Sequence, residues 1–218
     1  QSRTKDQSKI LVMSQLVNPD THEDTAWLNT DTEDLWIYDK LILSRKLGYV
    51  CGPVGVDVPK DGHYIVRPVT NCVGLGLGTS IEYLTVRDWT DHLSPGMFWC
   101  EIFKGDHLSV DYEWGNPILS VQGFKSQHTF TRWDKWVRVD VDIQLPQLLK
   151  PLAKKYRYMC CEYIGGKLIE IHLRRNPDFD WGNTEFIPVW RGQDIAPPQG
   201  YRYVDYPECH GRVGAWIK

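Results

Sequence analysis

The feature that most constrains the fold is a glycine pair set between two runs of strand-forming residues. Residues 158–164 and 167–173 are largely apolar, and Gly165-Gly166 separates them. Two residues of this kind between such runs are typical of a tight turn that joins antiparallel strands. The pattern therefore predicts a β-hairpin, and with it at least one β-sheet.

Polar and apolar residues alternate along the second run. Glu170, His172 and Arg174 therefore share one face of the strand, while Ile171 and Leu173 face the core. Three such polar groups on one face could bind a divalent cation and an anion together, and oxygen ligands suit Mg²⁺. A half-exposed strand with a Glu–Arg ion pair explains the same pattern at least as well.

The side on which Glu162 lies depends on the register of this hairpin. A two-residue loop pairs Ile164 with Lys167 and places Glu162 on the surface opposite Glu170. A three-residue loop that includes Ile164 places both glutamates on one side. The sequence leaves the two registers open.

Helical and strand patterns interleave along the rest of the chain. Thr30 and Glu33 form a capping box, which predicts a helix that ends at Gly48 and holds Asp39 and Lys40 in its middle. Further strands are expected at residues 63–69, 97–103, 107–114, 118–124 and 136–143, and a second helix at 146–155. Helices among hairpin-connected strands indicate the α+β class.

Two further expectations concern residues 97–114 and the C-terminal part of the chain. The turn-forming tripeptide Lys104-Gly105-Asp106 is expected to join the strands at 97–103 and 107–114 into a hairpin. From Asn176 onward, a proline- and aromatic-rich sequence is expected to pack across the body of the protein.

Composition and charge exclude several classes of protein. The 218 residues carry a formal charge of −3, and 42% of them are hydrophobic, as in a globular chain with a large core. A net charge so close to zero argues against the globally basic surface of most nucleic-acid-binding domains. No apolar run reaches the roughly 18–20 residues of a membrane-spanning helix. A membrane partner is therefore not expected.

The six cysteines predict reduced thiols rather than a metal site. They include no Cys-x-x-Cys pair and no Cys/His array with zinc-site spacing. The polar residues 1–8 lack the basic start and apolar stretch of a secretory signal. We therefore expect a cytoplasmic protein.

Arg67-Pro68 and the glycines that follow could grip a phosphate. Arg67 ends a predicted strand, and the loop after it contains Gly74, Gly76 and Gly78. A fixed positive charge beside a flexible loop can aim backbone N–H groups at phosphate oxygens. The spacing is not that of a P-loop or of the dinucleotide fingerprint. A plain glycine-rich hairpin turn is the better explanation of the loop taken alone.

Glu101 lies inside an otherwise apolar predicted strand. A buried carboxylate without a partner is costly, so Glu101 should meet a donor from the protein or from a ligand.

Taken in order, four motifs resemble the ATP-grasp family of carboxylate–amine ligases. They are Asp39-Lys40, Arg67-Pro68 with its glycine loop, Glu101-x-x-x-Gly105 and Glu170-x-His172-x-Arg174, and the resemblance spans residues 34–178. It implies an α+β, ATP-grasp-like fold of two small lobes that grip a nucleotide. It also implies an ATP- and Mg²⁺-dependent, carbon–nitrogen bond-forming ligase that joins a carboxylate to an amine or similar nucleophile through an acyl phosphate.

The resemblance also implies the site residues. Those that bind the nucleotide would be Lys40, Arg67, Gly74, Gly76, Gly78, Glu101, Phe103, Asp106 and His107. Lys40, Arg67 and Arg174 would carry catalysis by positioning and charge stabilisation. The metal ligands would be Glu170, Glu162, His172 and Asn176, where His172 replaces the family's asparagine and Asn176 is a nearby substitute.

The same resemblance divides the chain into four parts. Residues 1–30 would be an N-terminal extension or short strand, 31–95 the first lobe, 96–178 the second lobe with the metal site, and 179–218 a C-terminal wrap. Only about 30 residues precede the predicted helix that holds Asp39-Lys40, so the part that binds the acid and the amine, whether small molecules or macromolecules, is reduced. The C-terminal aromatics, a second copy of the chain or a partner subunit would then complete the substrate site.

Two other functions compete with ligation. Arg67 and His172 depart from the family's residues, which would also suit a catalytically inactive nucleotide-binding interaction module. Residues 132–138 interleave cations with aromatic side chains, as in proteins that bind or modify nucleic acid. We weigh the nucleic-acid reading lower, because an ordinary strand with tryptophans inside and charges outside has the same pattern.

Overall fold

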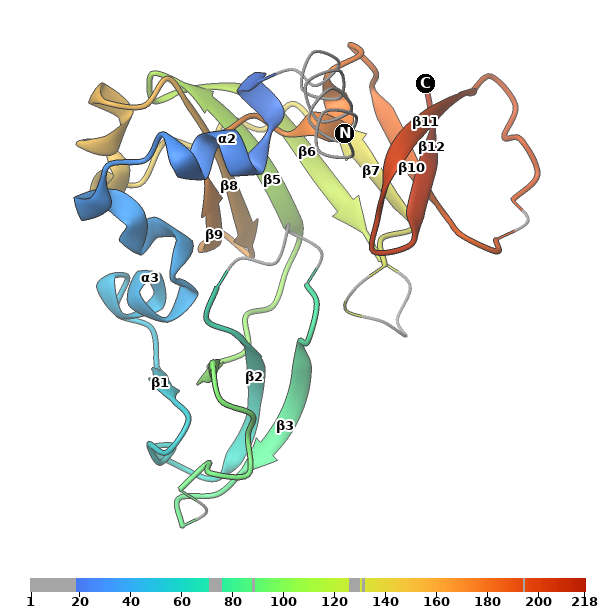
Figure 1. Cartoon of the computed structure of the whole chain (residues 1–218). Helices are drawn as coiled ribbons and strands as arrows, with labels where there is room; N and C mark the ends of the chain where they lie inside the picture. The colour runs from blue at the N-terminus through green and yellow to red at the C-terminus, as the bar shows by residue number, and fades with distance from the viewer. Residues whose placement is uncertain (1–18, 71–75, 88, 126–129, 131, 194) are drawn as a thin grey trace, which may run out of the picture.

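We analysed a computed structural model of the chain, which describes residues 19–70, 76–87, 89–125, 130, 132–193 and 195–218. Strands in this described part form two antiparallel sheets (Figure 1). The smaller sheet has the order β1-β4-β2-β3, with β1 at Cys51–Pro53, β2 at Gly62–Pro68, β3 at Ser80–Leu84 and β4 at Met97–Cys100.

The larger sheet has eight strands in the order β11-β12-β10-β7-β6-β5-β8-β9. Its strands are β5 (His107–Glu113), β6 (Asn116–Phe124), β7 (Lys135–Arg138), β8 (Tyr158–Ile164), β9 (Lys167–His172), β10 (Glu185–Trp190), β11 (Arg202–Cys209) and β12 (Arg212–Ile217).

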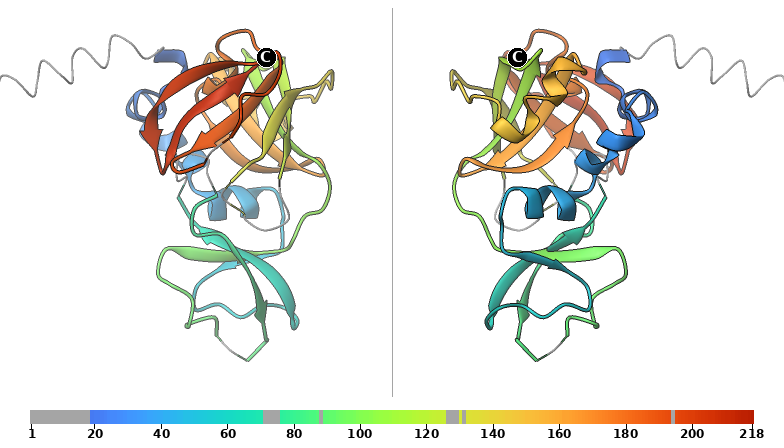
Figure 2. Two further views of the ribbon diagram at one scale, coloured as in Figure 1. Left: turned by 90° about the vertical axis from the view of Figure 1, so that its right-hand side faces the viewer. Right: turned by 90° about the vertical axis from the view of Figure 1, so that its left-hand side faces the viewer.

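The helical segments of the described residues are short. The α-helices are α2 (Glu23–Leu28) and α3 (Lys40–Lys46), and the 3-10 helices are η1 (Pro19–Thr21), η2 (Thr32–Tyr38), η3 (Gln147–Leu149), η4 (Leu152–Lys154) and η5 (Pro177–Phe179). The two side views show α3 at the level where the two sheets meet (Figure 2). None of the described helices is long and apolar enough to cross a membrane. Sheets with a few helices confirm the α+β class.

The main core lies on one face of β5, β8 and β9. Val110, Cys161 and Ile171 are aligned across these strands and are fully buried. Ile37 of η2 and Leu43 of α3 pack against them. Burial of side chains of this size contributes roughly 1.5–3 kcal/mol each, so this apolar face fixes the helices of residues 32–46 on the sheet.

The opposite face of the same strands is polar. Asp111, Cys160 and His172 lie next to one another across the strands, and Glu162 and Glu170 form the neighbouring pair. Successive side chains of a strand point to opposite faces, so the apolar and the polar face result from the same alternation.

The first predicted helix begins later than the capping box suggests. The Thr30 hydroxyl donates to the carbonyl of Ala26 instead of capping a helix. Asp39 is extended, with φ −99° and ψ 103°, and its carboxylate accepts the backbone N–H of Ile42. Asp39 is therefore the N-cap of α3 and Lys40 its first residue, rather than the middle of a longer helix.

The hairpin expected from residues 97–103 and 107–114 is wrong. β4 pairs with β1 and β2, whereas β5 pairs with β6 and β8. The chain therefore crosses from one sheet to the other through residues 101–106. Gly105 serves a close approach here, because an added Cβ would lie 2.7 Å from the Cα of Gly165.

Three other segments differ from the sequence-based expectation. The helix expected at 146–155 is replaced by η3 and η4, since Pro151 interrupts a continuous α-helix. β7 ends at Arg138, short of residue 143. Residues 185–217, expected to wrap irregularly, contain β10, β11 and β12 and extend the larger sheet.

Candidate functional site

A cavity of about 480 Å³ lies between the two sheets. Its walls come from β2 and β3, from the crossing segment 101–106, from the start of β5 at His107, from the end of β6 and from β8 and β9. The cavity brings together residues that are far apart in sequence, from Lys40 to Glu170.

Two buried cations stand at one corner of this cavity. The backbone N–H of Lys40 donates to the carbonyl of Val69 at 2.7 Å, and Asp39 forms an isolated bridge with Thr70. These contacts tie the start of α3 to the end of β2. Lys40 is therefore held close to Arg67, and both side chains line the cavity.

Arg67 is only partly satisfied by the protein. One terminal nitrogen of its guanidinium donates to the carbonyl of Ile169 at 3.2 Å, and the group lies 5.2 Å from the ring centre of Phe98. Its Nε makes no hydrogen bond within the described part of the chain. Burial lowers the pKa of Arg67 and Glu170 opposes that shift, but a guanidinium stays charged in proteins.

Glu170 and Glu162 are the carboxylates of the site. Glu170 Oε2 lies 3.8 Å from Lys40 Nζ, while Oε1 lies 3.4 Å from His172 Nε2. These last two atoms are not aligned for a hydrogen bond, and neither has a hydrogen-bond partner among the described residues. Burial raises the pKa of Glu170, but Lys40 and His172 more than offset burial and hold it below its usual range.

The open question of the hairpin register has an unexpected answer. Ile164 pairs with Lys167 across a two-residue loop, and Glu162 nevertheless pairs with Glu170. A register shift between Glu162 and Tyr163 reconciles the two, because a bulge adds one residue to β9. Both carboxylates therefore line the cavity. Glu162 also lies 2.9 Å from His107 Nε2.

The crossing segment supplies further predicted residues to the cavity wall. Glu101, Phe103, Asp106 and His107 all line it. The Glu101 carboxylate accepts the backbone N–H of Val50 at 2.9 Å, so it has a donor as expected. Glu101 is half-buried and follows β4 at Met97–Cys100, however, and the prediction that it lies inside a strand is wrong. Phe103 packs edge-on against Tyr49, with ring centres 4.7 Å apart.

The glycines of the loop before β3 differ in their positions. Gly76 lines the cavity with φ +63°, and a Cβ added there would lie 2.8 Å from the carbonyl oxygen of Phe130. Gly78, with φ +71°, lies against Pro68 and does not line the cavity. Gly74 lies outside the described residues.

The other predicted residues on the polar face are not in the cavity wall. His172 and Arg174 lie behind Glu170 and contact Glu23 of α2. The amide oxygen of Asn176 accepts the backbone N–H of Asp178 and caps η5, so it is already engaged. Roles in metal binding or catalysis for these three residues stay predictions.

Lys125 is a cavity residue that the sequence analysis did not single out. Its Nζ donates to the carbonyl of Phe130 at 2.6 Å and lies 4.8 Å from the ring centre of Trp133. Burial lowers its pKa to about 8, although Glu162 opposes the shift. The sequence offered one indication of its position, because Lys125 directly follows the predicted strand 118–124.

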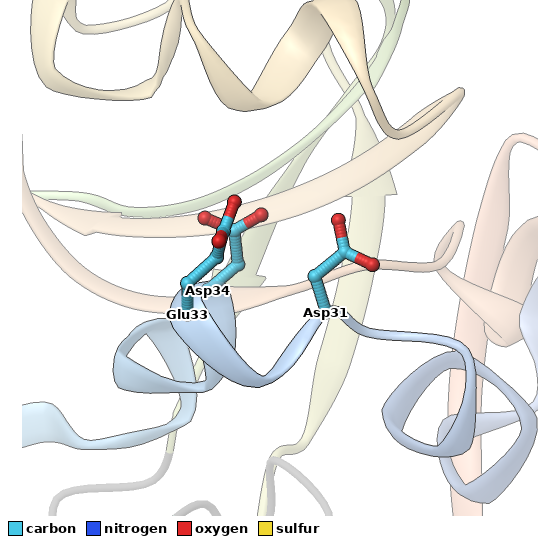
Figure 3. A group of neighbouring side chains, drawn as sticks. All are labelled: Asp31, Glu33 and Asp34. Carbon is cyan, nitrogen blue, oxygen red and sulfur yellow. The ribbon is translucent and has the colours of Figure 1, made fainter.

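Asp31, Glu33 and Asp34 form an acidic cluster (Figure 3), in which Asp31 and Glu33 are exposed and Asp34 is buried. Lys155 Nζ lies 2.5 Å from Glu33 and 3.0 Å from Asp34. The Tyr156 hydroxyl also donates to Asp34. Protein donors therefore satisfy this cluster, which lies away from the cavity wall.

The cations and aromatics of residues 132–138 are used within the protein. Lys135 pairs with Glu185, and Arg132 lies over the ring of Trp190. Trp136 is buried in a second apolar cluster, which is separate from the main core. Of these, residues 135–138 form the strand β7, while Trp133 precedes it and lines the cavity.

No protein-family model matches the sequence, and no curated protein is significantly similar to it. Solved structures do resemble the fold. A protein of Archaeoglobus fulgidus provisionally assigned to the ATP-grasp superfamily is 17% identical, with 83% of this chain and 64% of that chain covered and a TM-score of 0.47. An L-amino acid ligase of Bacillus licheniformis is 10% identical, with 84% and 66% covered and a TM-score of 0.49. The ATP-grasp ligase PsnB is 18% identical, with 67% and 54% covered and a TM-score of 0.40.

This chain spans 54–66% of the length of these three solved chains. Two of the three are described as ATP-grasp proteins, the family that the sequence motifs resemble. The likeness concerns the fold alone, so we argue the function from the cavity's own residues.

Proposed function

We propose that the cavity between the two sheets binds ATP with Mg²⁺ and that the protein transfers the γ-phosphoryl group to a substrate carboxylate, with release of ADP. An amine or similar nucleophile then displaces phosphate from the acyl phosphate. The observation that carries this proposal is the meeting of Lys40, Arg67, Glu162 and Glu170 in one cavity of about 480 Å³. Two cations from different elements face two carboxylates that a β-bulge has aligned. A nucleotide triphosphate with its metal ion requires both kinds of group.

Two buried polar atoms of the cavity residues lack hydrogen-bond partners among the described residues, which supports the binding of ATP and Mg²⁺. Arg67 Nε and Glu170 Oε1 have no hydrogen-bond partner in the described part of the chain. Buried polar atoms without partners are costly, so a ligand that supplies an acceptor to Arg67 and a cation to Glu170 would relieve both. ATP supplies the first through its phosphate oxygens and Mg²⁺ supplies the second.

The metal donors also fit. Glu170 and Glu162 would hold the ion, and carboxylate oxygens are the protein ligands that Mg²⁺ prefers. Bound Mg²⁺ would neutralise charge on the phosphate oxygens. His172 touches Glu170 but is a weaker candidate ligand, because imidazole suits softer metals.

The protein's own contribution would be positioning and charge. Lys40 and Arg67 would hold the phosphates at one corner of the cavity, which aligns the terminal phosphoryl group for attack. Lys125 adds a third cation to the cavity wall. The crossing segment, with Glu101 and Phe103, would bind the base and ribose. Removal of a single donor of this kind elsewhere costs on the order of 10²–10³ in rate.

The first test is thermal unfolding with and without ATP and Mg²⁺. Saturation at 100 times the dissociation constant should stabilise the wild type by about 2.7 kcal/mol. Lys40→Met should lose this stabilisation, because Lys40 lines the cavity. The matched control is Lys46→Met at the other end of α3, where the side chain is exposed over Trp36. An unmoved wild type, or equal losses in both variants, would contradict the proposal.

A nucleotide-binding module without ligase activity is the second candidate function. One observation favours it: His172 and Arg174 are engaged with Glu23 rather than facing the cavity. The two functions differ in turnover. ADP release that depends on an added carboxylic acid would establish ligation, while nucleotide binding without acid-dependent ADP release would establish the module.

A further inference from the structure

Two cysteines face each other at one edge of the smaller sheet. Cys51 of the edge strand β1 is paired with Cys100 of β4 in the antiparallel register. The backbone N–H of Glu101 donates to the carbonyl of Val50 at 2.9 Å. Val50 and Glu101 therefore form a hydrogen-bonded pair, and since the two kinds of pair alternate, Cys51 and Cys100 form a non-hydrogen-bonded pair.

A non-hydrogen-bonded pair brings two side chains as close as antiparallel strands allow. The Cα atoms of such a pair are about 4.5 Å apart, which lies inside the range of roughly 4.4–6.8 Å that disulfides span. Because the two residues are directly opposite, their side chains also point to the same face of the sheet. The thiols of Cys51 and Cys100 can therefore form a bond while the strands keep their register.

Contacts around the pair fix this register. The backbone N–H of Val50 donates to the Glu101 carboxylate at 2.9 Å. On the opposite face, the Trp99 ring lies against Gly52, where an added Cβ would be 2.5 Å from the ring. Trp99 Nε1 also donates to the carbonyl of Val56 at 2.9 Å. These contacts oppose slippage of β1 along β4 and keep the two thiols opposite each other.

The two thiols differ in their access to solution. Cys51 is half-buried, whereas Cys100 is buried in the wall of the cavity. Burial raises the pKa of the Cys51 thiol, and it raises the pKa of Cys100 to about 12 although Arg67 opposes that shift. Both thiols are therefore protonated at neutral pH and react slowly, and Cys51 is the one that an oxidant from solution reaches first.

We propose that Cys51 and Cys100 are a redox modification site, at which a low-molecular-weight disulfide oxidises the two thiols to a reversible cross-strand disulfide. The Cys51 thiolate attacks one sulfur of the oxidant and expels the other as a thiolate, which takes up the proton that Cys51 released. The Cys100 thiolate then attacks Cys51 Sγ and expels the second thiolate, which takes up the proton of Cys100. Two protein thiols are thus oxidised, and one small disulfide is reduced to two thiols.

The bond would fasten the edge strand β1 to the sheet. β1 has three residues and lies between α3, which begins at Lys40, and the rest of the smaller sheet. Its partner β4 ends at Cys100, directly before the crossing segment 101–106. Oxidation would therefore tie the segment after α3 to the segment that leads into the larger sheet. The inference does not depend on the proposed function, because no nucleotide enters it.

Oxidation of the folded wild type in glutathione buffers tests the site. The reduced protein is incubated at mildly alkaline pH with rising ratios of oxidised to reduced glutathione until no further change occurs, quenched with acid, digested and mapped by mass spectrometry. We expect a disulfide between the peptides that contain Cys51 and Cys100, and its loss when excess reduced glutathione is added. Thiols that stay reduced throughout, or a bond between other cysteines only, would overturn the proposal.

A matched pair of serine variants sharpens this test. Cys51→Ser removes one member of the pair, whereas Cys209→Ser removes another half-buried cysteine, in β11 of the larger sheet. The intramolecular disulfide should be lost in Cys51→Ser and should form as in the wild type in Cys209→Ser. The opposite pattern would contradict the assignment. If Cys51→Ser does not fold, the peptide map of the wild type decides alone.

Amide hydrogen exchange measures what the bond does to β1. Exchange over residues 49–53 should be slower in the oxidised than in the reduced wild type by at least about tenfold, the factor that about 1.4 kcal/mol produces. Exchange over α2, none of whose residues is fully buried, should be the same in both forms, because it reports local opening far from the bond. Equal exchange over residues 49–53 in the two forms would overturn the proposed fastening of β1.

Discussion

Side chains along β5, β8 and β9 alternate between an apolar and a polar face of the sheet. The two faces bind neighbouring segments through different interactions. On the apolar face, Val110 and Ile171 are buried against η2 and α3, so shape and volume decide what fits. On the polar face, His172 and Arg174 are buried as deeply, but their partners are charges. A charge can be exchanged for another of the same sign, whereas a packed side chain is replaced only at the cost of a cavity. The polar face is therefore where ligands can act.

The largest expected effect comes from breaking the apolar face. Ile171→Ala should lower the free energy of unfolding by about 2–5 kcal/mol, because Ile171 is fully buried and its loss leaves a cavity. Denaturant-induced unfolding measures this change. Leu28→Ala, on the exposed side of α2, is the control and should leave the free energy of unfolding close to that of the wild type. Similar losses in the two variants would refute the contrast between the faces.

A smaller effect should come from pH, and only on the polar face. His172 has a pKa of about 9, above its usual 6.5, so its contribution to stability is complete below pH 6.5 and is lost as the pH rises through 9. The pKa of Glu23 is lowered to about 2, so its contribution is complete above pH 4.5 and is lost as the pH falls toward 2.

Unfolding of the wild type and of His172→Gln at pH 6 and pH 9 measures the first of these losses. The stability advantage of the wild type over His172→Gln should shrink by on the order of 1–3 kcal/mol between the two pH values. An advantage that stays constant or grows would mean that the ion pair with Glu23 does not form.

The smallest effect is expected at Glu33, an exposed member of the acidic cluster. Glu33→Gln should leave the free energy of unfolding unchanged within error, because the Glu33 side chain is largely exposed and solvent screens its ion pair with Lys155. Asp34→Asn, at a buried member of the same cluster, should be more destabilising. Thermal unfolding compares the two variants. A larger loss in Glu33→Gln would show that burial is not what separates strong from weak charge pairs in this protein.

Local sequence patterns predicted much of the polar face. The alternation from Glu170 to Arg174 places these polar side chains together, and Gly165-Gly166 sets the hairpin as expected. The pattern could not choose the side of Glu162, because a bulge in β9 combines the two-residue loop with the side that was expected from the three-residue loop. Turn residues report the loop length, whereas a bulge depends on packing further along the strands.

Long-range contacts were less predictable. The strand at 97–100 and the strand at 107–113 look like a hairpin locally, but Gly105 is used for a close approach to Gly165. Glu23 could not be placed at all, because nothing in a short helix near the start of the described chain indicates a partner about 150 residues away. Lys40 and Arg67 were found as separate motifs, and only the contact between Lys40 and Val69 shows why they meet.

The central claim is that one cavity gathers cations and carboxylates around a nucleotide, and an experimental structure with a non-hydrolysable ATP analogue and Mg²⁺ tests it most directly. We expect the phosphates to lie beside Lys40 and Arg67 and the ion to be bound by Glu170 and Glu162. A nucleotide bound elsewhere, or a cavity that stays empty at saturating analogue, would contradict it.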